Sequence, residues 1–345
     1  MKHIYKTLFL IGSLMLLGLF VMSSRYMNPS TGDELASFQP SVYKNLITYT
    51  KGDLFVFETE KPSPKKMDQF SEKSRQLLGN RLSVPSIRSN EVMERSKSDP
   101  TAFFEANISE GKLAFNKGMQ NYLDKGGREL PSQENANKAS LQFIQESGLA
   151  PENKEELIMM HSGGLRTSFA GSNETIDVLR TVTYGRLLDG VPVYGAGSKI
   201  IVQVGNKGEI VGATSRWKKV QETSKKRVGE VEMKSARDAE VEMKRRLLTE
   251  FGKGTKSKLE NMALAYYDGA GSHIQPAYFF QVKVMLPQVN DAPPVRFDYM
   301  GIVPALANSP ERIEVMDTPK EASLIKKLSS KPTLDIREKK SRDIE

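Results

Sequence analysis

Hydrophobic and polar residues alternate along much of the middle of the chain, with the period of two that is typical of β-strands. The clearest run is 175–187, where Ile176, Val178, Val182 and Tyr184 fall on one face. Further strands are predicted at 54–58, 157–160, 165–169, 198–203, 209–213, 262–267, 275–285, 296–302 and 313–315. Most of these runs are short and bounded by turn residues, which favours antiparallel sheet.

Two hairpins are indicated by turn residues between alternating runs. Residues 103–119 alternate on both sides of Ser109-Glu110-Gly111. The strands 198–203 and 209–213 flank Asn206-Lys207-Gly208, where the glycine supplies the positive φ that a tight turn needs.

Two segments instead show the helical period of about 3.6. The first is 133–147, with Ser132 as N-cap and Gly148 just after its end, and the second runs from 235 to 251. The core-facing positions are predicted to be Ala136, Ala139, Ser140, Phe143 and Ile144 in the first helix, and Val231, Ala236, Ala239, Met243, Leu247 and Phe251 in the second.

A helix followed by strands occurs twice, at 133–217 and at 235–303. We therefore predict an α+β fold of antiparallel β-sheets, each with a packed helix, arranged as two tandem α-β-β-β units. The predicted divisions are an N-terminal extension and polar linker at 25–100, a first unit with its preceding hairpin at 101–220, a second unit at 221–317 and a charged disordered tail at 318–345. Within the extension we expect the strand at 54–58 and one short helix at 67–78.

The N-terminus has the pattern of an export signal. Lys2 and Lys6 precede the apolar run Leu8–Met22, which at about 15 residues is short for a helix crossing a ~30 Å hydrocarbon core. Residues 1–24 are predicted to be a signal peptide or an uncleaved signal anchor, in which case residues 4–22 would contact the membrane. Both place the rest of the chain outside the cytoplasm, as a secreted, periplasmic or cell-surface protein.

Composition narrows the classes of function. The chain of 345 residues has a net charge of +8 but no cysteine, which excludes disulfides, thiolate metal sites and a cysteine nucleophile. The positive charge is scattered, and no nucleic-acid-binding motif accompanies it. Together with the export signal, this predicts no nucleic-acid partner.

Candidate catalytic groups are few. His161 lies before Ser162-Gly163-Gly164, without a Gly-x-Ser-x-Gly elbow, and is interpreted as a loop residue. His273 and Asp268 would give a metal only two ligands. The glycines at 190, 195 and 197 match no phosphate-binding pattern and are explained by turns. We predict no catalytic residue, cofactor or metal, and hence no enzyme.

One segment resembles a known kind of domain. The residues Asp189–Gly195, Lys199–Val204 and Gly208–Val211 are similar to a conserved corner of the PepSY and FTP (fungalysin/thermolysin propeptide) domains. Arg216-Trp217 and Gln275–Phe280 resemble the N-terminal region of uncharacterised exported bacterial and archaeal proteins. The resemblance extends over residues 103–304.

In secreted metallopeptidases this domain assists folding of the protease and inhibits it until removed. The chain has no His-Glu-x-x-His sequence. The resemblance therefore implies a non-catalytic protein that binds another protein, such as a secreted protease, in an inhibitory or folding-assistance role. A membrane-anchored envelope regulator or structural protein, and an enzyme of unfamiliar type, stay open as alternatives.

The partner is predicted to contact the corner at 189–197 together with Trp217, through Asp189, Tyr194 and Trp217. An exposed Trp217 would suit partner recognition, because tryptophan is enriched in interface hot spots. The other interpretation is that Trp217 covers the core at the end of a strand.

Overall fold

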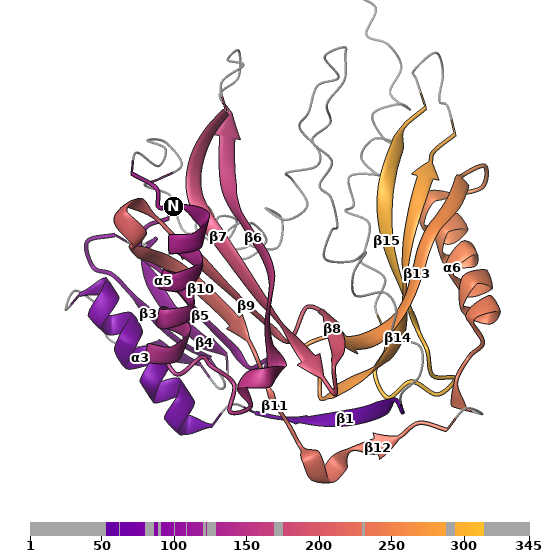
Figure 1. Cartoon of the computed structure of the whole chain (residues 1–345), viewed down its shortest axis with the longest axis horizontal. Helices are drawn as coiled ribbons and strands as arrows, with labels where there is room; N and C mark the ends of the chain where they lie inside the picture. The colour runs from indigo at the N-terminus through magenta and orange to yellow at the C-terminus, as the bar shows by residue number, and fades with distance from the viewer. Residues whose placement is uncertain are drawn as a thin grey trace, which may run out of the picture. The chain divides into compact units, whose positions relative to one another are not determined.

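The computed structural model describes residues 53–61, 63–79, 86–88, 91–99, 101–107, 109–119, 122, 129–168, 175–229, 232–287 and 294–313 (Figure 1). The predicted export signal at 1–24 and tail at 318–345 lie outside these residues. Among the helices described, none is long and apolar enough to cross a membrane.

The fold is α+β, with a large mixed, mostly antiparallel sheet and three α-helices in the described part of the chain. The helices are α3 (Pro64–Leu78), α5 (Gln133–Glu146) and α6 (Ala236–Phe251). The strands are β1 (Phe55–Glu60), β2 (Ser86–Arg88), β3 (Glu91–Arg95), β4 (Phe103–Asn107), β5 (Lys112–Asn116), β6 (Leu157–Ser168), β7 (Thr175–Leu188), β8 (Val191–Gly195), β9 (Lys199–Val204), β10 (Ile210–Arg216), β11 (Lys219–Val220), β12 (Lys226–Arg227), β13 (Lys256–Asp268), β14 (His273–Met285) and β15 (Arg296–Pro304).

The strands follow the order β11-β1-β14-β13-β8-β7-β9-β10-β5-β4-β3-β2. Three more strands pair beside this path, β12 with β1, β15 with β14, and β6 with β7. All the pairs are antiparallel except β8 with β13, which run parallel. That parallel pair joins the strands of the two predicted units.

One core lies where α3 and α5 cover the sheet formed by β4, β5, β10, β9 and β7 (Figure 1). Phe70 of α3 packs against Phe104 and Phe115, and Phe143 of α5 also contacts Phe115, with ring centroids 5.6–6.3 Å apart. The amphipathic face predicted for α5 is confirmed, and Ser132 caps the helix by accepting the backbone N–H of Asn135.

A second core lies between α6 and the meander β13-β14-β15. Met243 and Leu247 of α6 pack against Phe280 and Val282 of β14. Ser235 accepts the backbone N–H of Asp238 and caps the helix, as its sequence predicts. The predicted core position Ala236 is exposed because it lies in the first turn, before the helix meets the sheet.

Several predicted boundaries change. The two strands predicted at 157–160 and 165–169 correspond to one strand, β6 (Leu157–Ser168), and Ile313 lies in no strand. The turn at 206–208 is confirmed, with positive φ at both Lys207 and Gly208. The hairpin over 103–119 is confirmed as β4 and β5.

The strand expected at 54–58 and the helix expected at 67–78 are present as β1 and α3. The described residues before 100 are nevertheless more than a polar linker, because Phe70 of α3 is fully buried and the hairpin β2–β3 extends the sheet beyond β4. β1 pairs with β14, more than 200 residues later. The few apolar residues here are separated by long polar stretches, so the sequence shows too little periodicity to predict β2 and β3.

Replacing Phe70 with alanine tests whether α3 is part of the core. We expect Phe70→Ala to lower the free energy of unfolding by about 3–5 kcal/mol, because it leaves a cavity among Phe104, Phe115 and the helix. Urea unfolding measures the change, with the exposed Asp68→Ala on the same helix as control. Equal small effects of both substitutions would contradict this packing.

Candidate functional site

The corner at 189–197 is a tight hairpin followed by a parallel strand. Leu188 pairs with Val191, so Asp189 and Gly190 form a two-residue loop, and both have positive φ. An Asp-Gly pair is the usual sequence of such a turn because glycine, and aspartate to a lesser degree, tolerates this backbone conformation. The turn directs β8 alongside β13.

The next two glycines allow β8 to approach the end of β13. Gly195 lies opposite Asp268, with φ of 126°, and a Cβ there would overlap the Asp268 carbonyl oxygen. A Cβ on Gly197 would overlap the Asp268 carboxylate. The backbone N–H of Gly197 donates to the Asp268 carbonyl at 2.9 Å. Close backbone approach, in addition to turn geometry, therefore accounts for these glycines.

Asp268 is a buried carboxylate at the centre of this junction. The Ser198 hydroxyl donates to Oδ2 at 2.6 Å, and the backbone N–H of Ala270 donates to Oδ1 at 2.8 Å. Burial raises the pKa of the Asp268 carboxyl, although these hydrogen bonds and the nearby Arg186 and Lys218 oppose the rise. Desolvation is the largest of these effects on the pKa.

Arg186 and Lys218 tie the junction to the rest of the sheet. Buried Arg186 pairs with Glu156 at 2.6 Å and donates to the Lys218 carbonyl at 2.8 Å. The Lys218 ammonium donates to the carbonyls of Ala270 and Gly271 at 2.8 and 2.7 Å, in the loop after β13. The polar groups at the junction satisfy one another, which is the arrangement of a structural network.

The structure corrects the predicted contact surface. Tyr194 and Trp217 are buried, with 6% and 4% of their surface exposed, and they belong to different core clusters. Tyr194 stacks edge-on against Phe279 at 5.0 Å, and Arg186 lies over the Trp217 ring at 5.1 Å. The rings therefore pack the core and are not offered to a partner.

Asp189 is the member of the predicted set that stays at the surface. It lies at the hairpin tip, where its carboxylate pairs with Lys225 at 2.7 Å. Sequence pattern could not place the aromatic rings, because the residues that cover them, Arg186 and Phe279, belong to other strands.

The two histidines are in different settings. His161 lies in strand β6 and is exposed, so its prediction as a loop residue is wrong. His273 Nδ1 lies 2.9 Å from Ser272 Oγ, and Glu311 accepts from the Ser272 hydroxyl and the His273 backbone. Asp268 turns to Ser198 instead, so it forms no site with His273. Glu311 was missed in the sequence because the segment around it has no periodic pattern.

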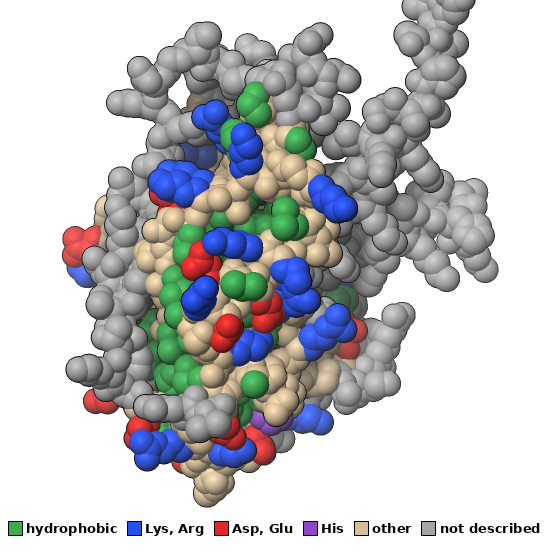
Figure 2. All heavy atoms as spheres, turned by 90° about the vertical axis from the view of Figure 1, so that its right-hand side faces the viewer, with side chains coloured by type: hydrophobic (Ala, Val, Ile, Leu, Met, Phe, Trp, Pro, Cys, Tyr) green, Lys and Arg blue, Asp and Glu red, His purple; other side chains and the backbone are tan. Residues whose placement is uncertain are grey.

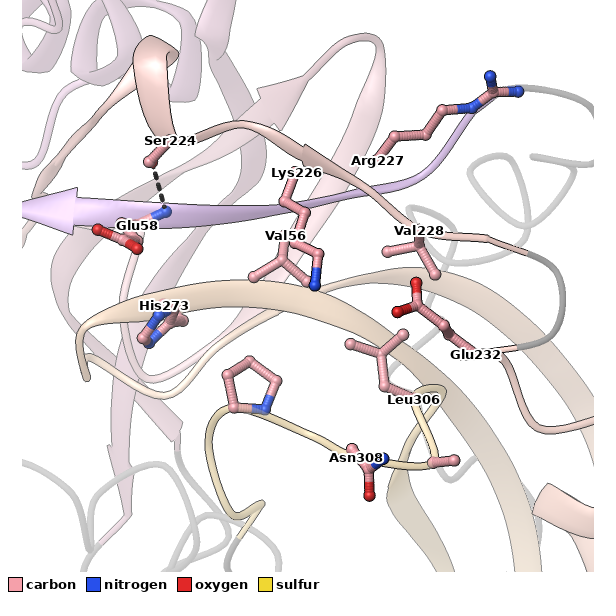
Figure 3. A pocket seen from close by; sticks show the side chains of 12 residues that line it. Val56, Glu58, Ser224, Lys226, Arg227, Val228, Glu232, His273, Leu306 and Asn308 are labelled. Carbon is pink, nitrogen blue, oxygen red and sulfur yellow. Dashed lines mark hydrogen bonds between the residues drawn. The ribbon is translucent and has the colours of Figure 1, made fainter.

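A groove of about 390 Å³ lies between β1, β12 and the segment 306–310 (Figure 3). Val56, Val228 and Leu306 give it an apolar part. Lys226, Arg227, Glu58 and Glu232 add both signs of charge at its walls. The Glu232 carboxylate is engaged by the backbone N–H of Gly229 at 3.0 Å. The mixed lining favours neither an anionic nor a cationic ligand, and the residues described contain no cluster of three or more potential metal ligands.

Two long strands lie at margins of the sheet. Among the described strands, β15 pairs only with β14, and β6 pairs only with β7. β6 has register shifts near Met159 and near Leu165, whereas β15 pairs without interruption from Arg296 to Pro304. Bulges protect an edge from further pairing, and a regular edge presents unpaired N–H and C=O groups. On β15 the Ile302 carbonyl already accepts from Arg246 of α6 at 2.9 Å. The outer edge of β15 at 296–300 is therefore the better candidate for binding an added strand.

No family model matches the chain, and no curated protein matches its sequence. A solved structure of an uncharacterized protein from Eubacterium rectale is similar at 13% identity with a TM-score of 0.44, covering 76% of this chain and 86% of that one.

Adding one methyl group at the junction tests the close approach. We expect Gly197→Ala to lower the free energy of unfolding by about 1–3 kcal/mol, because its Cβ meets the Asp268 carboxylate. Gly229→Ala is the matched control, since the nearest atom to a Cβ there is 3.8 Å away. Urea unfolding of both variants provides the measurement, and a neutral Gly197→Ala would contradict the geometry.

The raised pKa of Asp268 predicts a pH effect of known sign. The folded protein favours the neutral carboxyl, so the contribution of Asp268 to wild-type stability should fall as pH rises from about 4 through the folded-state pKa. Asp268→Asn has no proton to lose, so its free energy of unfolding relative to wild type should increase over that range. Urea unfolding at a series of pH values measures this difference.

Ser198→Ala gives the converse control. The Ser198 hydroxyl lowers the Asp268 pKa. Without it, the free energy of unfolding should fall more steeply with pH in Ser198→Ala than in wild type. If the free energy of unfolding of Asp268→Asn relative to wild type stays constant with pH, or decreases as pH rises, then ionisation of Asp268 does not destabilise the folded protein.

Proposed function

We propose that this is an exported, non-catalytic protein that binds another protein by pairing a strand of that partner with β15. The observation that carries the proposal is the regular outer edge of β15, which no described strand occupies. Main-chain hydrogen bonds along such an edge supply affinity, and alternate side chains supply specificity.

The tandem arrangement supports the same class of protein. α6 is followed by the antiparallel meander β13-β14-β15, which is an α-β-β-β unit with the helix on one face. α5 is followed by β6, β7, β9 and β10, with β8 as an extra strand leading to β13. We interpret these as two units related to the PepSY and FTP domains, joined by β8.

A secreted protease is the proposed partner class, in an inhibitory or folding-assistance role. The resemblance to propeptide domains at 189–211 supports this choice, and strand addition suits a protein that occupies an extended cleft. The apolar run Leu8–Met22 supports the variant in which the protein stays anchored as an envelope regulator.

Two exposed methionines allow a matched test of the β15 edge. Met300 on β15 and Met159 on β6 are exposed to 43% and 47% and lie on the two candidate edges. We expect Met300→Lys to reduce partner recovery by about tenfold or more, equivalent to about 1.4 kcal/mol, because lysine at an edge disfavours strand addition. Met159→Lys should leave recovery unchanged.

The measurement is cross-linked affinity capture from the extracytoplasmic fraction of the producing cells, followed by hydrogen exchange on the complex. Amides at 296–304 should be protected in the wild-type complex. If Met300→Lys still retains the partner, and the β15 amides show no protection in the complex, this edge is excluded as the binding site. Failure of the wild-type protein to retain any partner would contradict the binding function itself.

A further inference from the structure

The side of α6 that faces away from the sheet carries apolar and basic residues together. We call it the outer α6 face and define it by Arg237, Val241, Lys244, Arg245 and Leu248. At 100° per residue these positions lie opposite or beside the buried row of Ala239, Met243 and Leu247. All five are exposed, and Val241 and Leu248 are two helical turns apart on the same side.

The charge on this face is predominantly positive. Asp238 is the exposed acid at its N-terminal end, where it also contacts the Ser235 hydroxyl at 2.7 Å. Glu240 lies at its border and pairs with Lys244. Glu242 points along the flank, where it pairs with Lys234 and Arg246. Figure 2 views the side on which α6 lies in Figure 1, where Lys and Arg side chains are interspersed with hydrophobic side chains and with Asp and Glu.

α5 provides an internal comparison, because its outward side has an exposed leucine but no such charge. Leu141 is 40% exposed, compared with 49% for Leu248. Near it, Lys138 pairs with Glu134, and Glu146 pairs with Lys73 of α3. Both helices thus expose a leucine, but on α6 the exposed leucine is surrounded by basic residues.

We propose that the outer α6 face rests on an anionic lipid surface. A helix that lies in a membrane interface combines apolar residues on one side with Lys and Arg beside them, which bind lipid phosphates. Val241 and Leu248 would enter the boundary between headgroups and acyl chains, while Arg237, Lys244 and Arg245 meet the headgroups. Charge alone would also attract an acidic protein, but the paired apolar residues two turns apart favour lipid.

The predicted position of the chain outside the cytoplasm makes this contact reachable. About 30 residues separate the apolar run ending at Met22 from Asp53, the first residue described. Fully extended, they span up to about 100 Å, so an anchored chain leaves α6 free to turn to the membrane. A cleaved chain would make the same contact reversibly. This surface is separate from the edge of β15 and does not depend on the proposed strand addition.

The absence of cysteine permits a direct test with single labels on the full chain. Leu248→Cys and Leu141→Cys are each labelled with an environment-sensitive fluorophore and mixed with phosphatidylcholine vesicles, with or without phosphatidylglycerol. We expect a blue shift at 248 only with phosphatidylglycerol, its loss in about 0.5 M salt, and no shift at 141. Any insertion of the N-terminal segment affects both labelled proteins alike and cannot produce this difference.

The charge requirement is tested in the Leu248→Cys background. The triple change R237Q/K244Q/R245Q should abolish the shift with phosphatidylglycerol. The proposal is overturned by the absence of a shift at 248, by equal shifts with both lipids, or by equal shifts at 248 and 141. A shift with soluble polyglutamate but not with vesicles would instead assign an acidic protein. Val241→Cys gives the same readout if Leu248→Cys fails to fold.

Discussion

Asp268 ends β13 with its carboxylate buried, at the point where β8 crosses from the strands after α5 to the strands after α6. The Gly197 N–H, the Ser198 hydroxyl and the Ala270 N–H all donate to this one residue. The parallel pair β8–β13 spans only Val193 to Gly195 on one side and Tyr266 to Asp268 on the other. So short a pairing depends on what surrounds it, and the Asp268 hydrogen bonds supply that support.

The rest of the central structure follows from this contact. Gly195 and Gly197 are needed because the Asp268 backbone and carboxylate occupy the space that a Cβ would take. Lys218 reaches the loop after β13, and Arg186 links Lys218 to Glu156. β1 then reinforces the joined sheet by pairing with β14 on one side and with β11 and β12 on the other. The described residues of the N-terminal extension, from β1 onward, are therefore part of the sheet.

Local chemistry in the sequence was enough to predict α5, α6 and most strands. Ser132 and Ser235 cap their helices, and Gly208 turns its hairpin, because each acts on backbone groups a few residues away. Residues that act over long distances could not be predicted in this way. Trp217 is covered by Arg186 and Tyr194 by Phe279, so their burial depends on strand order. The same limit explains why the edge of β15 and the outer α6 face were not among the predicted sites.

The structure changes where a partner is expected. Because the corner at 189–197 is a structural junction, we propose that a partner strand binds the regular edge of β15 instead. The outer α6 face points away from the meander β13-β14-β15, because α6 packs on that meander through Ala239, Met243 and Leu247. A protein held to a membrane through α6 would still have β15 accessible to pair.

Native-state hydrogen exchange tests most directly whether the Asp268 junction makes the two units one cooperative structure. Amides of β7 and β9 and amides of β13 and β14 are followed at increasing denaturant below the unfolding transition. If the junction joins the units, the most protected amides of both groups should converge on the same opening free energy and the same dependence on denaturant. Opening of β13 and β14 at a distinctly lower free energy, while β7 and β9 stay protected, would contradict this and leave two independent domains.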